Sequence, residues 1–305
     1  MEKKTSLGKS AVNLTVSKII GLVISMVTAM LLARLRTVEE YGTYSQLIIS
    51  INLATTIIMM GLPNSLNYFL AGAETKEERS YFLNVYYSLS TILSVVVGLF
   101  LVLIVPLLVR YFTNAALINF LYFLAVFPWT RIIMSSVENV LVVYNRTNTI
   151  TAFRLLNSAL LLGIVVLVQL MNWTFSTYMI LYLAVEILFT IVVYVIVKDC
   201  AGQLRFKFDL ELTKRIFKFS VPLGIASMIG TLNIELDKLV IGGLMDTEHL
   251  AIFTNASKAV ISSGQKDLSL YPSIIPSVLS SKIISALLCD STSKRGSSFS
   301  TFGAI

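Results

Sequence analysis

The sequence predicts an all-α fold, a polytopic bundle of transmembrane helices, and its composition, its long apolar runs and the physics of the bilayer support this prediction. The chain has 305 residues, of which 56% are apolar and only 13% charged, and its mean hydropathy is +0.80. Soluble domains carry about 25% charged residues. Apolar runs of about 18 residues or more recur, each long enough to cross about 30 Å of hydrocarbon. Such spans are expected to be helical, because loops or open sheet edges in lipid leave backbone groups without hydrogen bonds.

Seven spans are expected, at residues 11–35, 42–71, 81–109, 115–144, 150–171, 174–197 and 219–244. The first is longer than the core of a signal peptide and lacks a cleavage site, so it is expected to be a spanning helix. Pro63, Pro106 and Pro128 are expected to bend or end helices. A further apolar stretch, 268–288, contains two prolines and Lys282 and is a poor candidate for an eighth span.

The net charge of +7 is distributed by side, as in membrane proteins. The alternate loops that share a side with the N-terminus hold most basic residues: Lys3, Lys4, Lys9, Lys76, Arg79, Arg146, Lys198, Arg205, Lys207, Lys214, Arg215 and Lys218. The loops of the other side hold Arg34, Arg36 and Arg110. The bias places the N-terminus in the cytoplasm.

The domain organisation has four expected parts. Residues 1–198 form an N-terminal lobe of six helices, 199–218 a polar cytoplasmic connector, 219–258 the start of a second lobe, and 259–305 a tail with 13 serines. The connector is either an interfacial helix, with Leu210, Leu212, Ile216 and Phe217 on the membrane surface, or a solvated linker.

A faint internal repeat supports the second lobe. Residues 20–45 align with 229–254 with identities at Ile20, Gly21, Leu35 and Glu39, and an even number of spans separates the two copies. A parallel repeat of this kind is typical of two-lobed transporters. Two such lobes need about 400 residues, so we expect a C-terminally truncated second lobe, with a frame shift near Ala259 as the source of the tail.

Several charges fall inside the expected spans, where each costs about 2.5–3.5 kcal/mol in lipid and usually faces protein or a wet cavity. Lys18 and Glu138 lie at similar depth and are expected to pair across helices, whereas Arg131 and Glu138 share a face of span four about 10 Å apart. In span seven, Asn233 and Asp237 share one face, and Glu235 and Lys238 another. The last two either neutralise each other, line a substrate path or lie near the outer interface.

The stretch GLPNSLNYFLAG, residues 61–72, combines a proline with Asn64 and Asn67. A broken helix there either exposes backbone to a cavity or packs as a kink against a neighbour.

Other classes of function lack support in the residues. Cys200 and Cys289 lack metal-ligand or CxxC spacing, and His249 has no partner typical of a metal site, so no cofactor is expected. No basic face with interleaved aromatics indicates nucleic acid. The chain has no P-loop and no placed catalytic groups, so it is not expected to be an enzyme, although a membrane polysaccharide polymerase or sugar transferase is a minor alternative.

Three stretches resemble the oligosaccharide flippases, the O-antigen and capsule translocases of the multidrug/oligosaccharidyl-lipid/polysaccharide exporter superfamily. These are the segment with EYG.YS at 40–45, GLPNSLNYFLAG, and the segment with KFS.PLG at 218–224. The resemblance covers about residues 8–258, and the tail after Lys258 departs from it.

The resemblance implies two helical bundles around a central cavity in the bacterial inner membrane. It implies as substrate an undecaprenyl-diphosphate-linked oligosaccharide for O-antigen or capsular polysaccharide, with membrane lipids and the polysaccharide polymerase machinery as further expected partners. The candidate residues of the substrate path are Lys18, Arg34, Asn64, Asn67, Arg131, Glu138, Arg154, Asp237 and Lys238. A multidrug exporter of the related branch is the main alternative, and it requires acidic rather than basic cavity residues.

Overall fold

The computed structural model describes residues 2–59, 61–245 and 247–264. The chain divides into two compact units, Met1–Ser257 and Lys258–Ile305. Of the second unit, only residues 258–264 are described, as the end of a helix. The stretch 268–288 and the serine-rich tail from residue 265 lie outside the described residues, so their predictions remain untested.

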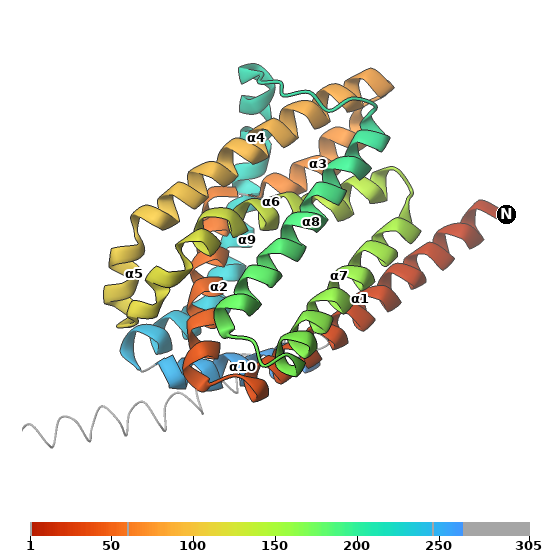
Figure 1. Ribbon diagram of the computed structural model, residues 1–305. Coiled ribbons are helices and arrows are strands. Elements are labelled where there is room, and N and C mark those ends of the chain that lie inside the picture. Colours follow the sequence, from red (N-terminus) through yellow and green to blue (C-terminus); the bar gives the residue numbers. More distant parts are fainter. Residues whose placement is uncertain (1, 60, 246, 265–305) are drawn as a thin grey trace, which may run out of the picture. The chain divides into compact units, whose positions relative to one another are not determined.

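The described residues form helices joined by short loops, with no strand among them (Figure 1). The elements are α1 Glu2–Leu35, α2 Val38–Met59, α3 Leu62–Gly72, α4 Lys76–Leu103, α5 Val105–Phe112, the 3-10 helix η1 Ala115–Phe120, α6 Leu121–Val143, α7 Thr147–Leu170, α8 Phe175–Ala201, α9 Leu210–Leu244 and α10 Thr247–Gly264. The all-α bundle predicted from composition is therefore confirmed.

The helices reproduce the expected spans. Five are long and apolar enough to cross a membrane, and the number rises to seven if α2 with α3, and the two halves of α9, each count as one bent span. These seven correspond one by one to the seven predicted stretches. The division of residues 1–258 into two lobes stays a prediction.

Prolines and one glycine determine where the helices bend or begin. Gly61 separates α2 from α3 with φ of 73°, Pro63 follows in the first turn of α3, and the pair bends by 44°. Pro106 lies in the first turn of α5, directly after the end of α4. Pro128 is accommodated inside α6. The prolines therefore bend or start helices without removing a span.

The segment between α8 and α9 is shorter than the expected connector 199–218. Residues 203–209 lie outside any helix, and two of their backbone N–H groups donate to α4: Arg205 to Asn84 Oδ1 at 2.8 Å, and Lys207 to Ser88 Oγ at 2.9 Å. Helix α9 then begins at Leu210, nine residues before the expected span, because Asp209 caps its first turn.

Most of the apolar residues expected on the membrane surface lie inside the bundle instead. Ile216 is fully buried, and Leu212 and Phe217 pack against the hydrophobic core, whereas Leu210 is exposed. The first turns of α9 thus continue the spanning helix and are not a separate interfacial helix. They use their apolar face for packing within the bundle.

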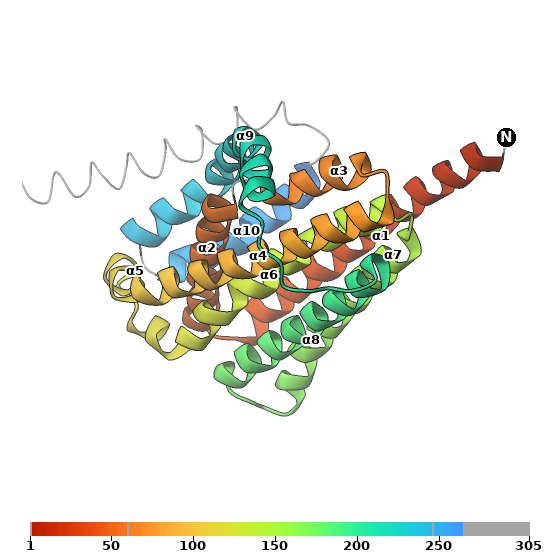
Figure 2. The ribbon, with the colours of Figure 1, turned by 90° about the horizontal axis from the view of Figure 1, so that it is seen from above.

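Helix α6 lies at the centre of the first unit and packs against α2, α3, α4, α7 and α8. Its aromatic side chains Phe123 and Phe127 stack on each other and adjoin Tyr182 of α8 in the buried core. Helix α1 packs chiefly against α7, and the two run side by side in both views (Figures 1 and 2). Large apolar side chains of α1 and α7 remain exposed, as expected for helices facing lipid.

The loops of the bundle gather at two ends, here called the basic end and the opposite end. The basic end comprises the loops 73–75, 144–146 and 202–209 together with the start of α1, and the opposite end comprises the loops 36–37, 113–114 and 171–174. An ion pair between Arg146 and Asp199 joins two elements at the basic end. Helices α3 and α6 end at the basic end, whereas α9 begins there and packs against α2 and α3.

Candidate functional site

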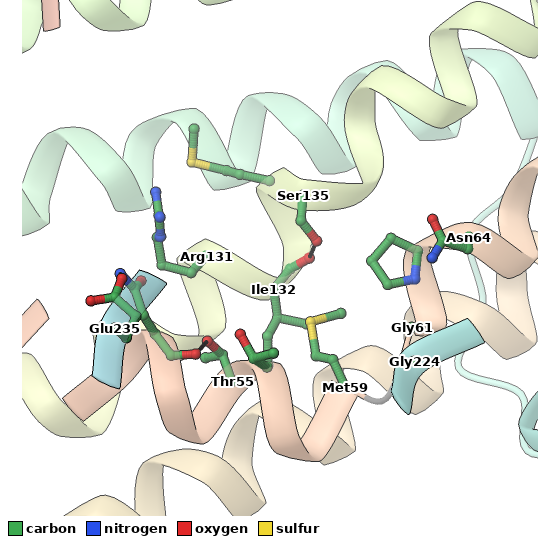
Figure 3. Close-up of a pocket in the computed structure, with 13 residues that line it drawn as sticks. Thr55, Met59, Gly61, Asn64, Arg131, Ile132, Ser135, Gly224 and Glu235 are labelled. Carbon is green, nitrogen blue, oxygen red and sulfur yellow. Dashed lines mark hydrogen bonds between the residues drawn. The ribbon is translucent and has the colours of Figure 1, made fainter. Parts of the chain in front are cut away.

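A pocket of about 570 Å³, lined by apolar, polar and charged side chains, lies where α2, α3, α6 and α9 meet (Figure 3). Its lining comes from the second half of α2, the start of α3, the middle of α6 and two points of α9. The lining residues are Asn52, Thr55, Thr56, Met59, Gly61, Pro63, Asn64, Arg131, Ile132, Met134, Ser135, Gly224 and Glu235. The pocket therefore lies within the bundle, between helices that are far apart in sequence.

The break between α2 and α3 forms one wall of the pocket. Gly61, Pro63 and Asn64 line it, and no side chain caps the N-terminus of α3. Gly61 also touches α9 closely, since a Cβ atom there would fall 2.7 Å from the backbone nitrogen of Gly224. The partial positive charge of a helix N-terminus thus lies beside the cavity, as expected of a broken helix that exposes backbone.

Arg131 brings a positive charge to the pocket from α6. Its side chain is exposed, and within the part of the chain that the structure describes no carboxylate lies within salt-bridge distance of it. The guanidinium carbon lies 5.9 Å from the centre of the Phe127 ring. Arg131 also acts electrostatically on Glu186 of α8, which is 3% exposed. The guanidinium donors are therefore available to a ligand in the pocket.

Glu235, the acidic residue of the lining, is neutralised within α9. Lys238 Nζ lies 2.9 Å from its Oε2, and Asn52 Nδ2 donates to its Oε1 at 3.3 Å. Both charged side chains are buried. Of the three alternatives for Glu235 and Lys238, the structure shows their mutual neutralisation, with Glu235 also in the pocket lining. Arg131 is then the one charged lining residue without a salt bridge to the described residues, and its charge is positive.

A second charged cluster joins three helices. Glu138 of α6 accepts from Lys18 of α1 at 2.8 Å and from Arg154 of α7 at 2.5 Å. The predicted pairing of Lys18 with Glu138 is confirmed, and the additional partner Arg154 was not foreseen. Lys18 and Arg154 therefore already have an anionic partner, unlike Arg131.

The family model described as "Polysaccharide biosynthesis protein" matches residues 7–265. The chain belongs to this family. Neither the curated proteins nor the solved structures gave a match. Membership in the polysaccharide biosynthesis family, together with several apolar helices, makes the chain a multi-pass membrane protein with a role in polysaccharide biosynthesis or export.

The structure distributes the candidate residues of this polysaccharide biosynthesis protein over three places. Asn64 and Arg131 line the pocket, and Lys18, Glu138 and Arg154 form the charged cluster. The remaining candidates lie elsewhere: Arg34 is exposed in the last turn of α1, Asn67 is exposed on α3 and donates to Asn139 at 3.4 Å, Asp237 is half-buried on α9 outside the lining, and Lys238 is the buried partner of Glu235.

Several polar lining residues escaped prediction. Asn52 and Thr55 lie one turn apart in α2, and Ser135 lies one turn after Arg131 in α6. Their spacing of three or four residues in otherwise apolar spans is the signal that indicates a shared wet face. Within the described residues, no group of three or more His, Cys, Asp or Glu side chains has the arrangement of a metal site.

Proposed function

We propose that this polysaccharide biosynthesis protein moves an undecaprenyl-diphosphate-linked oligosaccharide across the bacterial inner membrane, and that the pocket binds its diphosphate. The observation that carries the proposal is Arg131, a cation that lines a pocket inside a membrane bundle and forms no salt bridge with the described residues. A charge held within spanning helices is costly unless water, protein or a ligand compensates it. A diphosphate supplies that compensation.

The donors around Arg131 suit phosphate oxygens. A guanidinium binds phosphate through two parallel hydrogen bonds, which are stronger than bonds between neutral groups. The hydroxyl groups of Thr55 and Ser135 donate to backbone carbonyls of their own helices, so the side-chain amides of Asn52 and Asn64 are the further donors in the lining. These groups can replace part of the hydration shell of the anion, and the N-terminus of α3 adds a favourable dipole.

The size of the pocket favours the head group over the lipid tail. Small-molecule sites typically enclose about 300–1,000 Å³, and the pocket of about 570 Å³ falls in this range. A long prenyl chain is apolar and costs nothing when it stays in the hydrocarbon of the bilayer. The proposal therefore seats the diphosphate and its nearest sugars in the pocket and leaves the tail in lipid.

The direction of transport follows from the charge bias of the loops. The basic end is proposed to face the cytoplasm, where Lys and Arg are enriched in membrane proteins. The substrate would then enter from the cytoplasmic leaflet and leave to the periplasmic side, where contact with the polysaccharide polymerase machinery is proposed. No chemical step is assigned to the chain.

The multidrug alternative requires an acidic cavity. Glu235 is the acidic residue of the lining, and Lys238 already neutralises it. An organic cation would therefore meet the unpaired charge of Arg131, which repels it. This charge balance favours an anionic substrate.

The test is ligand binding to the full chain in lipid nanodiscs. Wild-type protein is expected to bind farnesyl diphosphate and not the cation ethidium, with at least a tenfold loss of diphosphate affinity in Arg131→Gln, about 1.4 kcal/mol or more. Arg131→Lys is expected to retain part of the affinity. Arg110→Gln removes an exposed arginine of α5 outside the pocket and serves as the matched control. Ethidium binding, or equal diphosphate affinity in Arg131→Gln, would overturn the proposal.

A further inference from the structure

Two cations share one carboxylate in the cluster of Lys18, Glu138 and Arg154. Lys18 Nζ lies 2.8 Å from Glu138 Oε1, and Arg154 Nη2 lies 2.5 Å from Glu138 Oε2. Each carboxylate oxygen therefore has its own cation. With all three groups ionised, the cluster keeps a net charge of +1, since one negative charge offsets only one of the two positive ones.

The cluster lies between the pocket and the basic end. Ser135 lines the pocket, and Glu138 follows it by three residues on the same face of α6, in the direction of the basic end. Arg131 and Glu138 are separated by about 10 Å along the helix axis. An anion that moves along this face of α6 between the basic end and Arg131 therefore passes Glu138.

Both cations keep hydrogen-bond donors that Glu138 does not use. Arg154 Nη1 has no hydrogen-bond partner among the described residues, but it is buried, so an anion reaches it only after its neighbours move. The Lys18 side chain is 57% exposed, and its ammonium group has three donors, of which the pair with Glu138 uses one. The carboxylate itself is one-third exposed. A second anion can therefore approach the cluster from the side of Lys18 without unfolding it.

The backbone of α1 approaches Arg154 closely. A Cβ atom at Gly21 would lie 3.2 Å from both Cγ and Cδ of Arg154, so the glycine lets α1 pack on the arginine stem. Helix α1 contacts the rest of the first unit chiefly through α7. The ion pairs of Glu138 thus connect α1 and α7 to the central helix α6. Replacement of the Glu138 carboxylate by another anion breaks these ion pairs between the helices.

We propose that Glu138 is a resident counter-anion that competes with phosphate for Lys18 and Arg154, so that these residues form a second anion-binding station between the basic end and the pocket. This inference rests on the proposed function. An arriving phosphate takes over hydrogen bonds from Glu138. When the phosphate moves on to Arg131, Glu138 pairs with both cations again, which prevents the station from retaining the substrate.

The experiment is calorimetric titration of inorganic pyrophosphate into the full chain in nanodiscs. Glu138→Gln removes the competing charge and is expected to tighten pyrophosphate binding about tenfold. Lys18→Met lowers the net charge of the cluster to zero and is expected to weaken binding. The double variant is expected to return toward the wild-type affinity. Asp199→Asn, which removes a carboxylate paired with Arg146 outside this path, is the matched control.

A structural role alone gives a different result. If Glu138 only holds helices together, Glu138→Gln leaves the affinity unchanged or weakens it, and either outcome overturns the inference. If Glu138→Gln does not fold, Lys18→Met still tests the anion-binding station. The Lys18 side chain is mostly exposed, and its removal leaves the Glu138–Arg154 pair intact. Unchanged affinity in Lys18→Met contradicts the station.

Arg131→Gln separates this inference from the proposed function. Loss of pyrophosphate affinity in Arg131→Gln, without tightening in Glu138→Gln, supports the pocket and rejects the station. Tightening in Glu138→Gln with full affinity in Arg131→Gln rejects the pocket as the diphosphate site. Absence of pyrophosphate binding in wild type and in every variant overturns both.

Discussion

Lys238 lies one helical turn after Glu235 on α9, and its ammonium nitrogen is 2.9 Å from the carboxylate. The side chains are only 11% and 9% exposed, so the pair is shielded from water and from lipid. The charges of α9 thus compensate each other beside the pocket. This leaves Arg131 to determine the sign of the charge that a substrate meets.

The buried pair makes the chain sensitive to removal of one partner. Lys238→Met leaves Glu235 buried without its counter-ion, which is expected to cost about 3 kcal/mol of folding free energy. Reversible unfolding in mixed micelles measures the loss. The double variant Glu235→Gln with Lys238→Met is expected to recover most of it. Wild-type stability in the single variant would show that the pair does not form.

The break at Gly61 is expected to tolerate no side chain. Its φ of 73° disfavours L-residues, and a Cβ atom would meet the backbone of Gly224 and Ser220. Gly61→Ala is therefore expected to lower the unfolding free energy by about 1–3 kcal/mol and to weaken farnesyl diphosphate binding. Gly72→Ala is the control, because nothing lies within 4 Å of a Cβ atom there. Equal effects at the two positions would contradict the close approach.

A buried polar network holds the opposite end together. Asn114 donates to Thr43 Oγ1 at 2.9 Å and to Gln46 Oε1 at 2.8 Å, and accepts from the Ala116 N–H. Asn114→Ala leaves buried polar groups of α2 without this partner, which is expected to cost about 2 kcal/mol. Unfolding in micelles tests this, with Asn67→Ala as an exposed control. Equal stability of the two variants would show that the network contributes little.

The pH dependence at the basic end depends on Asp209. The Tyr81 hydroxyl donates to Asp209 Oδ2, and this bond, with the backbone N–H of Leu212, holds the pKa of the carboxyl below its usual value. A depressed pKa means that the ionised form stabilises the fold. This stability is present above the unfolded pKa, about 3.9, and is lost as the pH falls through the folded pKa.

Tyr81→Phe is expected to raise the pKa of Asp209 toward its ordinary value, because the leading cause of the shift is removed. Carbon-13 titration of labelled aspartate follows the change directly. Tyr68→Phe, which alters an exposed tyrosine stacked on Phe219, is the control. An unchanged titration of Asp209 in Tyr81→Phe would reject the hydrogen bond as the cause.

Much of the fold was predictable because a segment that crosses lipid must satisfy its backbone hydrogen bonds internally, which favours helices. Each of the seven expected spans is a helix or a bent pair, and the proline after Gly61 marked the break between α2 and α3. The start of α9 was not predictable, because Leu212, Ile216 and Phe217 suit a membrane surface as well as a protein core. The structure places them in the core.

From the sequence, the site could be predicted only at charged residues, because a charge in an apolar span is unusual enough to indicate a function or a partner. Arg131 and the pair of Glu235 with Lys238 stand out because charges in apolar spans need a reason. The contact of Arg154 with Glu138 depends on which helices adjoin α6, and a single sequence does not contain that information. The spacing of neutral residues such as Asn52 and Ser135 indicates a polar helix face, but the structure was needed to show that these faces meet in one pocket.

The most direct test of a hydrated anion site is the reactivity of a single cysteine at Ser135→Cys, in a chain whose Cys200 and Cys289 are replaced by serine. Ser135 is an exposed lining residue one turn from Arg131. We expect modification by a charged, water-soluble thiol reagent, protection by farnesyl diphosphate, and loss of that protection when Arg131→Gln is added. A cysteine that reacts only with a lipid-soluble reagent, or that farnesyl diphosphate never protects, would contradict it.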